Sequence, residues 1–479
     1  MMGTLTIAEA AAQIARGDLS PEDLLQQCMR KIHQYDGQVH AFHHVREDEA
    51  RAAAAVAARE IKGGGYRGPL HGIPVAYKDV VYVAGERVTA NSRRLAEFFP
   101  THDSTVIRRL KESGAVLVGS LNTFEFAFGG PAFDLPYPPA RNPWNPDRWT
   151  GAGSSAGSAA AIASGFCLGA LGTDAGGSIR SPASMSGISG IRPTFGRVST
   201  YGSIPLTFST EAAGPMAWTA KDCALMLQVL AGHDALDPFS ADEPVDDYTS
   251  LLGQGIEGLR VGLLTQFYEE DYATDPEIIE AINRVADTLK GLGAKVGNVP
   301  SGSSLWDYHA IGRIIIPAEA YAHHEEYLQQ HPEKYGELLR NRLMLGALIR
   351  ASDYLQAQRM RRRLTVEMQA LFNDWDVLLS PGMLRPAAPL SIKQIWPSLD
   401  LPMIDMPYSL TGNPSIAVCG GFFHDGMPIG VQLAGRYFDE ATVLRVADAY
   451  EQAAPWRKQR PDLGRLFGKT GADASRPTS

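Results

Sequence analysis

The chain has 479 residues, 44% of them hydrophobic and 20% charged, and its formal net charge is −9 at pH 7. This composition is typical of a large globular protein, and an acidic balance without a long basic block argues against a nucleic-acid partner. The four cysteines are far apart and form no CxxC pair, which favours buried thiols in a reducing compartment. The sequence shows neither a signal-peptide pattern nor an apolar stretch that could span a bilayer, so we expect a cytoplasmic protein that does not enter a membrane.

The first half of the chain alternates predicted helices and strands. Thr6 with Glu9 three positions later forms a capping box, which predicts the start of a helix. Lys78 lies in an otherwise apolar stretch with strand character. Helix followed by strand at short spacing indicates an α/β fold. The elements expected here are helices at about 7–16, 20–32, 47–61, 104–113, 159–171 and 220–230, and strands at 75–81 and 115–119.

The second half continues the pattern. A strand, a helix and a strand at 259–264, 276–292 and 295–299 form a β-α-β passage. The stretch 316–373 is predicted to be largely helical and contains little that suggests a catalytic or binding role. The arginines at 359–363 are expected to lie on a solvated helix face. The remaining elements are strands at 377–381, 415–419 and 429–433, a turn at Asp425-Gly426 and a helix at 440–452.

The stretch from Thr150 to Arg197 holds two clusters of glycine and serine, 151–158 and 174–178. Such clusters let backbone N–H groups and hydroxyls approach a ligand closely. The Walker lysine is missing, and the residues before Gly151 contain two prolines where a dinucleotide fold needs a central strand. Residues 153–157 match the letters GxSxG, but a Ser-His-Asp triad also needs a histidine. The twelve histidines sit mostly in helices or loops of ordinary character, so such a triad is not indicated. What remains is a serine nucleophile that a group other than histidine activates. A lysine can serve when burial lowers its pKa, because the neutral amine is then available as a base.

Three motifs occur in order along the chain: GIPVAYKD around Lys78, GAGSSAGS around Ser154 and TDAGGSIR around Ser178. In this order and spacing they resemble the amidase signature family, the Ser–cisSer–Lys amidohydrolases. The resemblance implies one large α/β domain, 1–467, with a central mixed, mostly parallel β-sheet covered by helices on both faces. It also implies a helical portion at 1–62, a catalytic core at about 66–235, a variable substrate-side segment at about 300–406 and a flexible tail at 468–479.

The same resemblance implies roles for individual residues. Ser178 would be the nucleophile and Lys78 the base. Ser154, after a cis peptide bond, would pass the proton between them. The main-chain N–H groups of Ala175, Gly176 and Gly177 would stabilise the oxyanion. The aromatic and proline-rich loop at 124–137 would contribute Phe128 and Gly129 to substrate binding, and we expect no cofactor and no metal. Ala152, Ala156, Ala175, Ser186 and Arg192 depart from residues common in the family.

We therefore expect an enzyme that cleaves the C–N bond of linear, non-peptide amides, and that could also accept aryl amides, esters or carbamates. Two alternatives remain open at this stage. One is the glutaminase subunit of a tRNA-dependent amidotransferase, and the other is a catalytically silent binding protein on the same fold. The expected partner is a small amide or carbamate, without nucleic acid or membrane, and the chain could form a homodimer.

Overall fold

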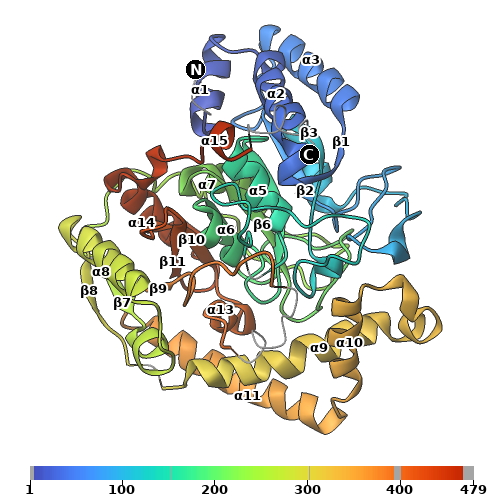
Figure 1. Ribbon diagram of the computed structural model, residues 1–479. Helices are drawn as coiled ribbons and strands as arrows, with labels where there is room; N and C mark the ends of the chain where they lie inside the picture. The colour runs from blue at the N-terminus through green and yellow to red at the C-terminus, as the bar shows by residue number, and fades with distance from the viewer. Residues whose placement is uncertain (1–4, 152, 301, 393–400, 468–479) are drawn as a thin grey trace, which may run out of the picture.

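The computed structural model describes residues 5–151, 153–300, 302–392 and 401–467. Within them an 11-stranded sheet runs through the molecule in the order β1-β3-β2-β4-β6-β5-β10-β11-β9-β7-β8 (Figure 1). The predicted tail, 468–479, lies outside the described residues. The strands are β1 Phe42–Val45, β2 Pro74–Lys78, β3 Val116–Leu121, β4 Gly169–Asp174, β5 Ser189–Arg192, β6 Ala212–Ala217, β7 Arg260–Leu263, β8 Lys295–Asn298, β9 Val377–Pro381, β10 Ser415–Phe422 and β11 Pro428–Ala434.

The sheet is mixed, as predicted, but it is not mostly parallel. Parallel pairing joins β2 to β3 and β4, and β7 to β8 and β9, while the other neighbouring pairs of described strands are antiparallel. The antiparallel pairing of β10 with β11 has a local reason, which is the short connection between them at the predicted turn Asp425-Gly426. A connection this short can join only antiparallel strands, because a parallel pair needs a crossover of a dozen or more residues.

Helices cover both faces of this sheet. The predicted capping box at Thr6 and Glu9 is confirmed at the start of α1. A Cβ added to Gly169 in β4 would meet Met226 of α7, whereas one added to Gly172 would meet the Ser155 hydroxyl in front of α5. Residues three apart in a strand face opposite sides, so α7 and α5 pack on opposite faces. The helices on and around the sheet are α1 Ile7–Arg16, α2 Pro21–Val39, α3 Glu47–Lys62, α4 Thr105–Glu112, α5 Ala156–Ser164, α6 Arg180–Ser186, α7 Ala220–Leu230, α8 Pro276–Gly291, α13 Met406–Thr411, α14 Glu440–Ala453 and α15 Leu463–Phe467.

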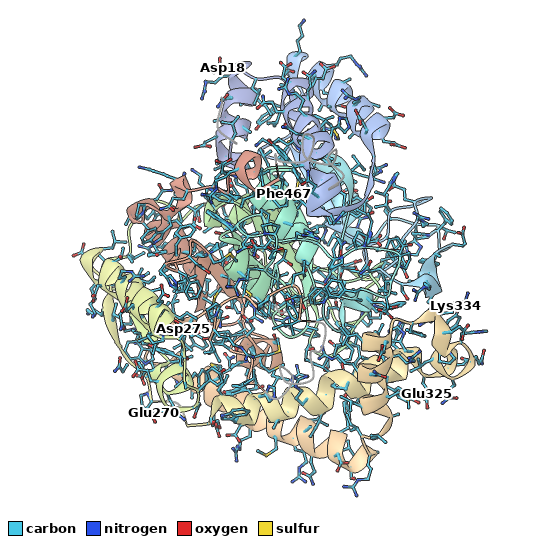
Figure 2. The ribbon with its side chains drawn as sticks, viewed as in Figure 1. Asp18, Glu270, Asp275, Glu325, Lys334 and Phe467 are labelled. Carbon is cyan, nitrogen blue, oxygen red and sulfur yellow. The ribbon has the colours of Figure 1, made fainter. Side chains whose placement is uncertain are left out.

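A further group of helices occupies the stretch that was predicted to be largely helical. These are α9 (Leu305–Gln330), α10 (Glu337–Ala347) and α11 (Ala351–Leu371). They lie at the lower edge of Figure 1, opposite α1 to α3, and Figure 2 labels Glu325 and Lys334 at the outer end of this group. Helix α9 packs against α10, α11 and α13. None of the helices in the described part of the chain is long and apolar enough to cross a membrane.

Candidate active site

Lys78 is the last residue of β2 and is fully buried. Its Nζ donates to the Ser154 hydroxyl oxygen over 2.6 Å and to the Thr173 hydroxyl oxygen over 2.8 Å. Burial lowers the pKa of Lys78 to about 7, against a smaller raising effect of Glu211 and then Asp174. An amine that is neutral in part near pH 7 can act as a general base, which the ordinary exposed lysine cannot do.

The two glycine and serine clusters meet in space. Gly153 lies against Ser178, because a Cβ at position 153 would stand 3.2 Å from the Ser178 Oγ. The backbone N–H of Ser155 donates to the carbonyl of Ser178 over 3.2 Å. Ser154 is fully buried between Lys78 and this junction, while Ser178 is half-buried. The fold therefore brings together the three residues that the motifs single out.

One detail of the expected geometry is wrong. No peptide bond within the described residues is cis, and these include both Gly153 and Ser154. Lys78 donates to the Ser154 hydroxyl oxygen although the peptide bond before Ser154 is trans. Among the described residues no direct hydrogen bond joins the Ser154 and Ser178 side chains, so the passage of a proton between them stays a prediction.

The loop that carries Ser178 is organised around the buried carboxylate of Asp174. This carboxylate accepts the N–H of Gly177 over 2.8 Å and that of Ile179 over 3.2 Å, and it pairs with Arg180 at 3.0 Å. Burial acts to raise the pKa of Asp174, but Arg180 and Arg192 outweigh it and hold that pKa well below its ordinary value.

This arrangement affects the predicted oxyanion site. Because Gly177 donates its N–H to Asp174, that group is already engaged before any substrate binds. A Cβ at Gly177 would lie 2.5 Å from the Cβ of Asp405, and the backbone there has a φ of 114°, so the position needs glycine. Ala175 and Gly176 remain the predicted oxyanion donors, and their roles are untested.

A pocket opens in front of Ser178. Phe128 and Gly129, the residues predicted to bind substrate, line it together with Gly153 and Gly176. The preceding residues are strained, since the non-glycine residues Phe126 and Ala127 have φ angles of 46° and 56°. Such conformations persist only where the surroundings hold them, and they cluster at functional sites.

Two arginines that line the same pocket were not predicted from the sequence. Arg313 of α9 and Arg342 of α10 line the same pocket. Arg342 donates to the carbonyl of Gly129 over 3.0 Å and its guanidinium lies 4.0 Å from the centre of the Phe128 ring. Within the described residues no carboxylate pairs with Arg342, and burial followed by the charge of Arg313 lowers its pKa. The pocket therefore presents positive charge beside Ser178. Nothing local in the sequence marks these arginines, because their place depends on how α9 and α10 pack against the catalytic core.

A larger cavity of about 610 Å³ adjoins this pocket and shares with it Gly129, Arg313 and Arg342. Its lining is mostly apolar, from residues such as Trp149, Met383 and Leu384. The site can thus accept a group larger than a primary amide.

The chain resembles known proteins over nearly all of its length. The family profile described as Amidase matches residues 23–444. The A subunit of glutamyl-tRNA(Gln) amidotransferase from Chloroflexus aurantiacus is 40% identical over 489 residues, which cover 96% of this chain and 98% of that protein. The structure of the Thermotoga maritima protein of the same name has a TM-score of 0.80 and 31% identity, covering 94% of this chain and 95% of that one. A chain of a complex described as vestigial, and as revealing the origins of an s-triazine catabolic enzyme, has a TM-score of 0.87 and 32% identity, covering 94% and 99%.

These relatives correct the expected list of partners, which excluded nucleic acid. Relatives that match over nearly their whole length are named as one subunit of an enzyme whose name includes a tRNA. The expectation rested on a net charge of −9, which describes this chain alone and does not exclude a partner that binds nucleic acid.

Proposed function

Since the chain belongs to the amidase family, we propose that it hydrolyses the side-chain amide of glutamine as the glutaminase subunit of a tRNA-dependent amidotransferase. The observation that carries this proposal is the similarity along the whole chain to relatives with that name, including 40% identity over 96% of the chain. This function was the second hypothesis from the sequence, and it now stands before the general amidase. A role beside tRNA would place the protein in the cytoplasm.

The chemistry uses the three residues of the motifs. Lys78, in its neutral form, draws a proton from the Ser154 hydroxyl, which takes one from Ser178. The Ser178 Oγ bonds to the amide carbon of glutamine, and the N–H groups of Ala175 and Gly176 stabilise the oxyanion. The C–N bond then breaks as the proton returns through Ser154 to the nitrogen, and ammonia leaves. Water releases glutamate from the acyl-enzyme by the same path.

The charge of the pocket suits this substrate. Glutamine carries an α-carboxylate, and Arg342 supplies a cation next to Ser178 that no carboxylate in the described part of the chain neutralises. Removing one partner from a buried, hydrogen-bonded charge pair typically costs about 2–5 kcal/mol of binding. Arg342 therefore offers a reason for preferring glutamine over a neutral amide of similar size.

Ammonia release from L-glutamine tests the proposal, with the chain alone and with the partner subunits from the same genome. Arg342→Gln is expected to raise KM for L-glutamine at least tenfold and to leave the rate with its α-methyl ester nearly unchanged. Arg340→Gln, on the same helix but outside both cavities, is the matched control. An absence of ammonia in both preparations would remove the glutaminase hypothesis.

One observation favours a second candidate, an amidase that acts on a larger apolar amide. The adjoining cavity of about 610 Å³ exceeds what glutamine needs. A panel of p-nitroanilides, primary amides and carbamates separates the two functions. Faster turnover of an aryl amide or carbamate than of glutamine in the complete assembly would support this candidate instead.

A further inference from the structure

Glu211 is a buried carboxylate behind Lys78 that no step of the mechanism uses. It directly precedes β6 and is 7% exposed. Its Oε2 accepts the backbone N–H of Leu206 over 2.8 Å, and its carboxyl group is hydrogen-bonded by the Thr173 side chain. A carboxylate in such a place is costly to bury unless these partners compensate for lost water.

The direction of these hydrogen bonds has a consequence for Lys78. When the Glu211 carboxyl group is ionised it can only accept hydrogen bonds, and the Thr173 hydroxyl then donates its single hydrogen to Glu211. The Thr173 oxygen can then only accept, and it accepts from Lys78 Nζ over 2.8 Å. One N–H of the amine is thereby directed at Thr173. In the neutral amine this leaves the lone pair free to face the Ser154 hydroxyl, which is 2.6 Å from Nζ.

Other charges near Lys78 do not duplicate this role. Asp174, on the neighbouring β4, lies between the buried guanidinium groups of Arg180 and Arg192. Asp405 is also engaged with Arg180, at 3.8 Å. After burial, which lowers the pKa of Lys78, the largest opposing influence on that pKa is Glu211, ahead of Asp174. Burial raises the pKa of the Glu211 carboxyl itself, and Lys78 partly offsets this effect.

We propose that Glu211 is a positioning residue for the reaction: through the Thr173 hydroxyl it orients the Lys78 amine toward Ser154, and by its charge it keeps that amine basic enough to work. The proposal rests on the roles proposed for Lys78, Ser154 and Ser178. It does not depend on which amide is the substrate.

Glu319 provides a matched control. It is also a buried glutamate, 3% exposed, and it holds the same loop by accepting the N–H groups of Phe208 and Ser209, each over 3.1 Å. Among the described residues it has no hydrogen bond to Thr173 or Lys78. Glu319→Gln therefore weakens comparable hydrogen bonds to the loop but leaves the contacts of Lys78 unchanged. A difference in reactivity between Glu211→Gln and Glu319→Gln then reports on the orientation of Lys78 and not on the stability of the loop.

The experiment measures the rate at which a fluorophosphonate probe labels Ser178 between pH 5 and 9, in the wild type, Glu211→Gln and Glu319→Gln. Loss of an anion within a few ångströms shifts a pKa by about 1–3. We expect Glu211→Gln to move the acidic limb of the profile at least one pH unit lower. It should also reduce the plateau rate at least tenfold, because the new side-chain amide can donate to Thr173 and turn the Thr173 hydrogen toward the lone pair of Lys78. Glu319→Gln should keep the wild-type profile.

A second pair keeps the test decisive if Glu211→Gln does not fold. Thr173→Val should lower the plateau at least tenfold, and Thr173→Ser, which keeps the hydroxyl, should restore it. Superimposable profiles for the wild type and Glu211→Gln, an equal shift in Glu319→Gln, or a wild-type plateau in Thr173→Val would each overturn the proposal. Unlabelled wild-type protein would overturn the assignment of Ser178 together with it. Labelled protein that shows these shifts but does not hydrolyse glutamine would support the role of Glu211 and refute only the proposed substrate.

Discussion

Replacing Asp174 with asparagine should both destabilise the protein and inactivate it. The carboxylate accepts two loop N–H groups, from Gly177 and Ile179, and two groups of Arg180, at distances from 2.8 to 3.2 Å. Arg192 lies 3.4 Å from the same carboxylate. Asparagine keeps one accepting oxygen but presents an NH₂ group to donors at the other position, and it leaves two buried guanidinium groups without their shared anion.

Breaking a buried ion pair by removing one partner costs about 3–5 kcal/mol. Arg180 keeps other partners here, namely Ser409 at 2.7 Å and Gln432 at 3.2 Å, so we expect a loss near the lower end, about 3 kcal/mol. Urea unfolding at pH 7, followed by tryptophan fluorescence, measures this loss of stability. The rate at which the fluorophosphonate probe labels Ser178 reports whether the loop that carries Ser178 keeps its conformation. Asp376→Asn is the control, because its partner Arg260 is substantially exposed and the loss should be far smaller. Equal losses in the two variants would refute the reasoning.

The same geometry makes three further expectations testable. The stability difference between the wild type and Asp174→Asn should shrink as pH falls below about 4, because a carboxyl whose pKa is depressed in the folded state loses its contribution when it is protonated; parallel urea curves at pH 3 and 7 would contradict this. Lys78→Ala should slow labelling of Ser178 by about 10²–10⁴ without lowering the thermal midpoint, and in the wild type the rate should rise with pH through about 7; labelling at the wild-type rate would exclude Lys78 as the base. Gly177→Ala should abolish activity, whereas Gly253→Ala, also at positive φ but with nothing within 4 Å of the added Cβ, should only reduce stability slightly.

Local patterns predicted several elements well. The capping box at Thr6 and the strand that carries Lys78 depend on short stretches of sequence, and the structure bears out both. The roles of the residues in the two glycine and serine clusters came from the family resemblance and stay predictions. The family resemblance added the single domain with a mixed sheet. The individual elements could be predicted from the residues because their physical causes lie within a few positions of the sequence.

The features that could not be predicted depend on contacts between distant segments. Arg361 was expected on a solvated helix face, yet it donates to the carbonyl of Leu410 and to the Ser209 hydroxyl. Arg342 meets Phe128 and Gly129 only because α10 packs across the pocket. Antiparallel pairs such as β4 with β6 and β5 with β10 likewise join strands that are distant in the sequence, whereas the pairing of β10 with β11 follows from the short turn between them.

The most direct test of the proposed mechanism is to find where the acyl group forms. The protein is mixed with L-glutamine, quenched in acid within milliseconds to seconds, digested, and its peptides are analysed by mass spectrometry. We expect a γ-glutamyl ester on Ser178 that is absent from Ser178→Ala and from Lys78→Ala. Ammonia release with the ester on another residue, or undiminished release by Ser178→Ala, would contradict the mechanism.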